Sequence, residues 1–219
     1  MDWFLGLPVL LFSVVMHECA HGYVASRCGD DTARYAGRIT LNPIPHIDPY
    51  GSILLPLLLI VTHSSFFIAW AKPVPVNPRN FRNPGRDDIV VSVAGPATNF
   101  LLAVLFALFF ALFAILGQVA IRSSSFLGQI ALAMMILTKY GVLINLILAI
   151  FNLIPIPPLD GSHILRELLP HRAAIEFDRI GRYGFIILII LVMTPVFKFI
   201  FFPADILFRL LVDIILVFV

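Results

Sequence analysis

The sequence predicts an all-α integral membrane protein: a polytopic helical bundle with a short strand-like or re-entrant insert after its first helix. Of the 219 residues, 60% are apolar and 13% are charged, whereas soluble domains average about 45–50% and 25%. The mean hydropathy is +0.98. This composition predicts that the protein lies in a lipid bilayer. A net charge of +2 is too small to indicate a nucleic-acid partner.

Several apolar stretches are long enough to cross a bilayer, which takes about 20 residues. They cover residues 3–26, 51–71, 89–121, 123–159 and 183–219. Prolines and polar residues interrupt the second and the last, so we expect at least four spans. No repeat, low-complexity tract or linker divides the chain. We therefore expect residues 1–219 to form one membrane-embedded domain.

The first apolar stretch carries a metal-site motif. His17-Glu18-Cys19-Ala20-His21 fits H-E-x-x-H, in which two imidazoles one helical turn apart can bind one zinc ion. The intervening glutamate then lies beside the ion as a general base. Chance would produce the pattern roughly 0.002 times in a chain of this composition. The alternative is that the two histidines and the glutamate have only a structural role. It is further weakened because an ionisable group at mid-membrane costs about 2.5–3.5 kcal/mol.

Asp160 is the candidate third ligand, because catalytic zinc takes three protein ligands and an open position. It is the only carboxylate between Asp88 and Glu167, and it follows a proline-rich stretch that cannot form a regular helix. Irregular backbone at membrane depth is tolerated only where protein buries it or where it lines a wet cavity. Two alternatives stay open: Asp160 caps the helix that follows, or Glu167 is the third ligand.

Together these residues resemble the site-2 protease family of intramembrane zinc metalloproteases. The matching motifs are His17-Glu18-x-x-His21, Ala94-Gly95-Pro96-x-x-Asn99 and Asn152-x-x-Pro155-x-Pro157-x-x-Asp160-Gly161. Residues 37–51, GRITLNPIPHIDPYG, resemble the short bacterial form that has neither a PDZ nor a CBS domain.

The resemblance implies an activity and a role for each site residue. One zinc ion per chain would be bound by His17, His21 and Asp160, with Glu18 as the catalytic glutamate. Asn152 would contact the unwound substrate, which would be a transmembrane segment of another membrane protein. The reaction would be zinc-assisted hydrolysis of a peptide bond within or near that segment.

Two other classes of function remain open. A zinc transporter could use the same residues for transit, but it would not need Glu18 between the histidines. A catalytically idle scaffold would tolerate the loss of residues that are intact here. The additional histidines, His46 and His63, are expected to have structural or interfacial roles. Cys19 and Cys28, nine residues apart on one helix, are about 13 Å apart and should stay free.

The zinc site also constrains the topology. If the first helix and the helix ending near Leu153 both deliver ligands to one ion, they end on the same side of the membrane. Residues 29–88 then begin and end on that side, so 51–71 must re-enter the membrane or cross it an even number of times. "RITLNP", within this segment, has a strand-like alternation that could pair with an extended substrate.

The distribution of basic residues predicts which side this is. The opposite connection, residues 118–129, contains only Arg122. The shared side carries Arg27, Arg34, Arg38, Lys72, Arg79, Arg82, Arg86, Arg166, Arg172, Arg179 and Arg182. By the positive-inside rule it is cytoplasmic. His17 is about 22 Å along a helix from Asp2, so we expect a multi-pass protein of the cell membrane with zinc in the cytoplasmic half of the bilayer.

Overall fold

The computed structural model describes residues 6–54, 57–58, 61–62, 70–121, 126–195 and 199–218, and every regular element in them is helical. The all-α prediction is confirmed. The longer helices are α1 (Gly6–Cys28), α4 (Pro84–Ile121), α5 (Phe126–Asn152), α6 (Asp160–Leu168), α7 (His171–Gly181), α8 (Gly184–Met193) and α10 (Phe202–Phe218). Short helical turns are α2 (Thr32–Tyr35), Ile44–His46, Pro49–Leu54 and Pro78–Asn80.

Three of these helices are long and apolar enough to cross a membrane: α1, the Pro84–Gly117 part of α4, and α5, with 23, 34 and 27 residues. The shortest is about 34 Å long, which exceeds a hydrocarbon layer of about 30 Å. Their outer faces stay apolar, with Leu101, Leu108 and Leu127 all well exposed. A helix that is apolar on its exposed face as well is suited to lipid. The protein is therefore a multi-pass membrane protein.

The two remaining apolar stretches differ from these three helices. The described part of residues 183–219 contains α8 and α10, of 10 and 17 residues, and no helix there is as long as the first three. Much of 51–71 lies outside the described residues. Three of the membrane crossings expected from the sequence are thus long helices in the described part of the structure.

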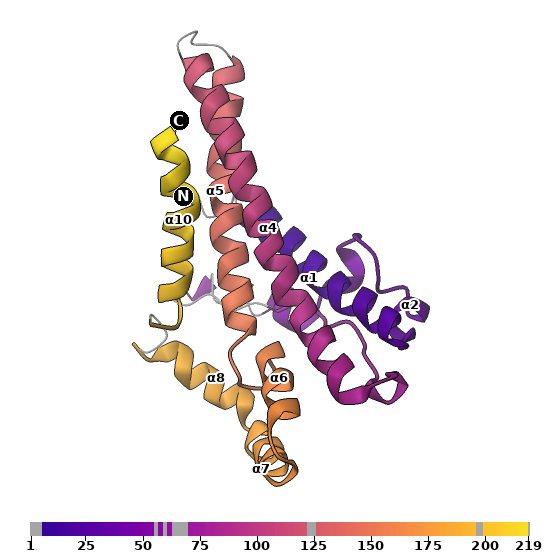
Figure 1. Ribbon diagram of the computed structural model, residues 1–219. Helices are drawn as coiled ribbons and strands as arrows, with labels where there is room; N and C mark the ends of the chain where they lie inside the picture. Colours follow the sequence, from indigo (N-terminus) through magenta and orange to yellow (C-terminus); the bar gives the residue numbers. More distant parts are fainter. Residues whose placement is uncertain are drawn as a thin grey trace.

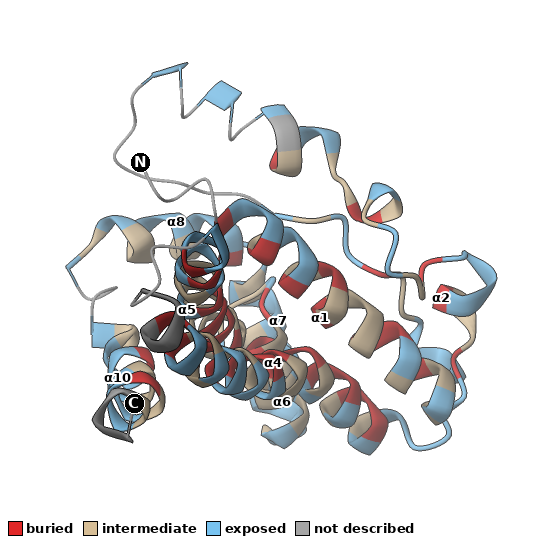
Figure 2. Ribbon diagram, turned by 90° about the horizontal axis from the view of Figure 1, so that it is seen from above, coloured by how far each residue is buried: buried red, intermediate tan, exposed pale blue. Residues whose placement is uncertain are grey.

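Helices α4 and α5 form a long hairpin, and α10 lies along α5 (Figure 1). Small residues allow the two long helices to approach closely: a Cβ on Gly141 would overlap the ring of Phe106. The buried residues face inward between α1, α4 and α5 (Figure 2). The main apolar cluster contains Ala103, Ala107, Phe110, Val142, Leu146, Ala204 and Val212.

One end of the bundle gathers the end of α1 and the beginning of α4. The N–H of Arg82 donates to the carbonyl of Cys28 at 3.1 Å, and Ala25, Phe81 and Val91 form a second buried cluster. Gly29 has a φ of +112°, a conformation that favours glycine, so the chain can turn directly after α1. Helix α6 packs against α4. Residues 29–82 therefore begin and end at the same place.

The insert between α1 and α4 leaves this end and returns to it. The N–H of Trp70 donates to the carbonyl of Gly51 at 3.2 Å, and the N–H of Lys72 to that of His46 at 2.9 Å. This return agrees with the expectation that residues 29–88 begin and end on the same side of the membrane. Residues 38–43, where alternation suggested a strand, instead form bends. The carbonyl of Thr40 in this stretch already accepts from Cys19 Sγ and from His46 Nε2.

Candidate metal centre

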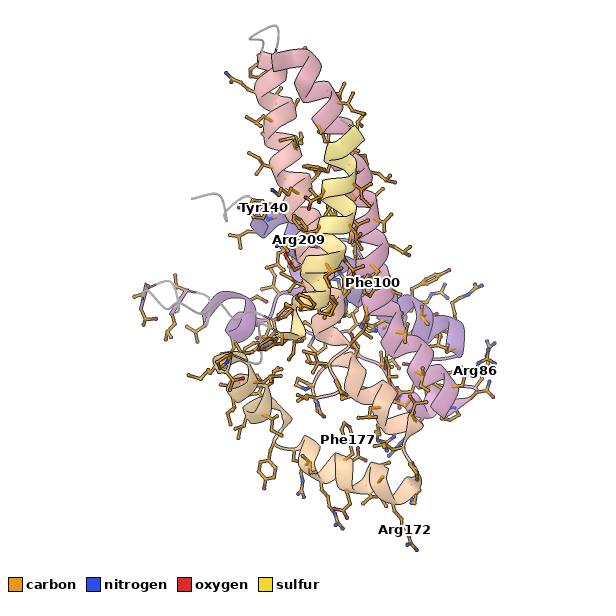
Figure 3. The ribbon with its side chains drawn as sticks, turned by 60° about the vertical axis from the view of Figure 1, so that its left-hand side comes forward. Arg86, Phe100, Tyr140, Arg172, Phe177 and Arg209 are labelled. Atoms are coloured by element: carbon orange, nitrogen blue, oxygen red, sulfur yellow. The ribbon has the colours of Figure 1, made fainter. Side chains whose placement is uncertain are left out.

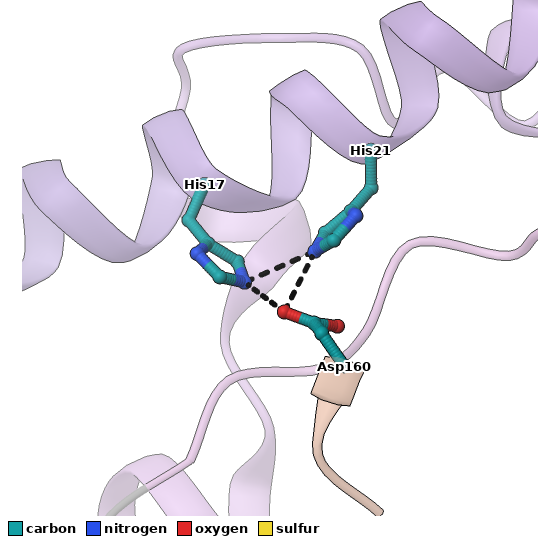
Figure 4. Close-up of side chains that lie close together, drawn as sticks. All are labelled: His17, His21 and Asp160. Atoms are coloured by element: carbon teal, nitrogen blue, oxygen red, sulfur yellow. Dashed lines mark hydrogen bonds and ion pairs between the residues drawn. The ribbon is translucent and has the colours of Figure 1, made fainter. Parts of the chain in front are cut away.

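The two histidines of the H-E-x-x-H motif lie on one face of α1, as their spacing predicts. Their Nε2 atoms are 3.0 Å apart, and the rings meet edge to face with centroids at 4.7 Å. His17 and His21 are only 6% and 8% exposed. Both rings point away from the axis of α1 toward Asp160 (Figure 4).

Asp160 reaches the histidines from the first turn of α6. Its Oδ2 lies 3.2 Å from His17 Nε2 and 3.4 Å from His21 Nε2. The chain turns so closely between α5 and α6 that a Cβ on Gly161 would overlap the carbonyl of Leu153. This close approach places the start of α6 against the end of α5 and sets the position of the Asp160 carboxylate.

A second contact ties α6 to α4. His163 Nδ1 lies 3.4 Å from Asp88 Oδ2. The Asp88 carboxylate favours the protonated imidazole and raises the pKa of His163 above its ordinary value, although burial acts in the opposite direction. The pair helps to hold the helix that carries Asp160 in place.

The partners of the two Nδ1 atoms show where each imidazole carries its proton. His21 Nδ1 lies 2.7 Å from the carbonyl of Val91, which can only accept, so that nitrogen carries the proton. His17 Nδ1 lies 2.5 Å from Asn99 Oδ1 and donates to it in the same way. Both Nε2 lone pairs therefore face each other and Asp160.

This donor set fits zinc. The carboxylate oxygen Asp160 Oδ2 is buried, and no group in the described part of the chain donates a hydrogen bond to it, so three acceptors converge with no proton between them. Ligands at about 2.0–2.1 Å in a tetrahedral site are separated by roughly 3.3 Å, close to the 3.0, 3.2 and 3.4 Å found here. A Cβ on Gly95 of α4 would overlap both imidazoles. The glycine therefore provides the space for the site.

Glu18 lies outside this group of ligands. Its Oε2 accepts a hydrogen bond of 2.7 Å from the N–H of Val74, in the irregular segment 70–77. Arg38 Nη2 donates to the carbonyl of Lys72 at 2.8 Å. Glu18 and Arg38 thus both bind the backbone of this segment. Among the described residues Glu18 Oε1 has no hydrogen-bond partner. The position of Oε2 is thus fixed by a hydrogen bond, and Oε1 is free to accept a proton.

The other residues considered from the sequence lie apart from the ligands. Asn152 ends α5, and its Nδ2 donates to the carbonyl of Leu148 at 2.9 Å. Glu167 pairs with Arg166 and lies beside Gly85, so Asp160 rather than Glu167 joins the histidines. His46 is buried and bonded to Thr40, and His63 lies outside the described residues. Both cysteines are free, as predicted.

Two buried amides near the site had no role assigned from the sequence. Asn99 of α4 contacts His17, and Asn145 of α5 contacts Asn99 at 2.8 Å. The signal in the sequence is their position: Asn99 lies in the uncharged part of α4, residues 89–121, and Asn145 lies in α5, where Lys139 is the one charged residue.

Comparison with known proteins agrees with this geometry. The chain is 37% identical over 212 residues, 93% of this chain and 90% of the relative, to "Putative zinc metalloprotease YwhC" of Bacillus subtilis. It is 31% identical to "Putative zinc metalloprotease Rip2" of Mycolicibacterium smegmatis, over 84% of this chain and 65% of that protein.

No solved structure matches the chain. The model of peptidase family M50 matches residues 5–194, which include both histidines, Glu18 and Asp160. The chain therefore belongs to peptidase family M50, the site-2 protease family, and is a zinc-dependent protease.

Proposed function

We propose that this protein is an intramembrane zinc endopeptidase that hydrolyses a peptide bond within or near a transmembrane segment of another membrane protein. The observation that carries the proposal is the group formed by His17, His21 and Asp160. Its histidines are buried and its aspartate is half-buried, and it lies against α1 and α4, two helices long enough to cross the membrane. A protease with its metal site there needs a substrate that is itself in the membrane.

His17, His21 and Asp160 would hold the zinc ion, one per chain. When bound, zinc supplies a Lewis acid that lowers the pKa of a water molecule and polarises the scissile carbonyl. The burial of both histidines keeps bulk water away and strengthens the electrostatic interactions within the site.

Glu18 is the proposed general base. It would take a proton from the attacking water through its unbonded oxygen and transfer a proton to the nitrogen of the leaving amine. The products are then a carboxylate and an amine. The bond from the Val74 N–H to Oε2 limits the rotation of the Glu18 carboxylate.

The substrate must present an extended peptide. A helical peptide bond is shielded by its own backbone hydrogen bonds, so the transmembrane segment has to unwind locally before hydrolysis. Asn152, at the end of α5 and eight residues before Asp160 in the sequence, is the proposed contact for this unwound stretch. Its Nδ2 is bonded within α5, and its Oδ1 can accept from a substrate N–H.

The active site is proposed to lie in the cytoplasmic half of the bilayer. Arg86 and Arg172 lie toward the end of the bundle where α4 begins (Figure 3). The far ends of the hairpin, residues 112–121 and 126–135, contain no basic residue. By the positive-inside rule the Arg86 end faces the cytoplasm.

Cleavage of defined single-span proteins in liposomes tests the proposal. The purified protein is incubated with a panel of such proteins, and mass spectrometry locates any new termini. We expect termini within or next to the membrane segment. Cleavage should stop when a chelator removes the metal and return when zinc is restored. Zinc-dependent cleavage confined to soluble regions, or zinc flux without cleavage, would contradict the proposal.

A further inference from the structure

A chain of buried hydrogen bonds connects the zinc ligand His17 to the middle of α5. His17 Nδ1 donates to Asn99 Oδ1 at 2.5 Å, and Asn99 Nδ2 donates to Asn145 Oδ1 at 2.8 Å. Asn145 Nδ2 donates to Ser13 Oγ at 2.8 Å and to the carbonyl of Gly141 at 2.9 Å. Ser13, Asn99 and Asn145 are all 0% exposed. The chain thus joins α1, α4 and α5 inside the bundle.

Only one orientation of the two amides satisfies this chain. The carbonyl of Gly141 can only accept, so the nitrogen of Asn145 must face it and its oxygen must face Asn99. The nitrogen of Asn99 therefore faces Asn145, and its oxygen faces His17. That oxygen can only accept, so the proton of His17 is on Nδ1 and its Nε2 lone pair faces Asp160.

We propose that Asn145 is a positioning residue for His17: through Asn99, it selects the ring tautomer that presents Nε2 to zinc. The inference rests on the zinc site proposed above. Asn145 has no hydrogen bond to His21 or Asp160, and it reaches His17 through the side-chain amide of Asn99. Partners that orient a ligating histidine affect metal affinity, typically by 10–100-fold.

Loss of the Asn145 oxygen would release the orientation of Asn99. Asn99 Nδ2 would keep only its 3.4 Å contact with the carbonyl of Ser13. The amide could then turn and present its NH₂ group to His17 Nδ1, which would stabilise the opposite tautomer. In that tautomer Nε2 carries the proton and cannot ligate zinc.

The test is the zinc dissociation constant of purified protein, measured by competition with a chelator. Asn145→Leu, which matches the size of the side chain, should weaken zinc binding about 10–100-fold. Thr138→Val is the matched control. Thr138 is buried on the same helix, and among the described residues its hydroxyl bonds only to the carbonyls of Met134 and Met135. The control should bind zinc within about threefold of the parent.

A double-mutant cycle separates positioning from a general effect on packing. In an Asn99→Asp background both oxygens of residue 99 can only accept, so the proton of His17 stays on Nδ1 whichever group residue 145 presents. There, Asn145→Leu should change the zinc dissociation constant by less than about threefold. A merely structural role would weaken zinc binding equally in both backgrounds, and that result would overturn the inference.

Further outcomes are equally decisive. Unchanged zinc affinity of folded Asn145→Leu protein would overturn the inference. If that variant does not fold, Asn145→Ser replaces it in both backgrounds, because serine is too short to reach Asn99 Nδ2, and the same criteria apply. A parent protein that binds no zinc would overturn the proposed site as well. A parent that binds zinc, with no loss on changing Asn145, would overturn only the inference.

Discussion

Asp160 Oδ2 lies 3.2 Å from His17 Nε2, and both atoms are hydrogen-bond acceptors. Two acceptors at this distance repel each other unless a cation lies between them. The contact therefore favours Asp160 as the third metal ligand over a role limited to capping α6. Among the described residues no donor reaches Asp160 Oδ2, which leaves this oxygen free to bind a cation.

Asp160→Asn should lose zinc and activity together, because a neutral amide is a weaker ligand than a carboxylate. Elemental analysis of the purified variant should give well below one zinc per chain. Glu167→Gln is the control and should keep its zinc, since Glu167 pairs with Arg166 instead. Full zinc occupancy in Asp160→Asn, with loss in Glu167→Gln, would reverse the assignment of the third ligand.

Gly95→Ala should also abolish zinc binding, for a steric reason. The added methyl group would occupy the space of both imidazoles, whereas alanine is itself the better helix former by about 1 kcal/mol. Gly117→Ala lies on the same helix, where no atom of the described neighbouring residues comes within 4 Å of the new methyl, and should bind zinc normally. Equal zinc content in both variants would show that Gly95 does not make room for the site.

The parts of this protein that follow from local pattern were predictable from the sequence. Apolar length predicted the long helices, and the four-residue spacing of His17 and His21 put both rings on one helical face. Asp160 could be identified because carboxylates are scarce in the apolar part of the chain. Each of these signals lies within one segment and needs no knowledge of what packs against it.

The parts that depend on contacts between segments were not predictable. Asn145 gains its place only because α5 packs against α4 and α1, and the bond from Val74 to Glu18 joins residues 56 positions apart. Residues 38–43 alternate like a strand, yet the carbonyl of Thr40 bonds to the side chains of Cys19 and His46 instead of a neighbouring strand. Tertiary partners outweighed the local pattern there.

Membrane topology can be tested by labelling single cysteines in a background where Cys19 and Cys28 are replaced. Tyr35→Cys and Arg172→Cys should react only with reagent on the cytoplasmic side, because both positions lie at the end where α1 finishes and α4 begins. Phe126→Cys, exposed at the start of α5, should react only from outside. Labelling of Tyr35→Cys and Phe126→Cys from the same side would contradict the proposed topology.

Asp30 should make the stability of the turn after α1 depend on pH. Burial acts to raise the pKa of Asp30, but hydrogen bonds from the Asn77 N–H, Thr32 and Asn80 outweigh it and lower the pKa below 3.8. The ionised form is thus favoured by folding. Its stabilisation is present above pH of about 4 and is lost as the pH falls through the lowered pKa.

Asp30→Asn should therefore lower the stability of the protein near neutral pH by about 1–3 kcal/mol. Thermal unfolding in detergent at several pH values measures this. The gap between parent and variant should narrow as the pH falls below about 4. A gap that stays constant with pH would show that the charge of Asp30 does not contribute.

If Glu18 is the base of a zinc protease, Glu18→Gln should stop cleavage without removing the metal. Glutamine can still accept from the Val74 N–H, so the contact with segment 70–77 is kept, but it cannot take a proton from water. Loss of a general base commonly slows a reaction by about 10²–10⁴-fold, or roughly 3–5 kcal/mol of barrier. The measurement is zinc content and cleavage rate of a membrane substrate, for parent and variant side by side. We expect one zinc per chain in both and cleavage by the parent alone; cleavage by Glu18→Gln within about threefold of the parent would contradict the account.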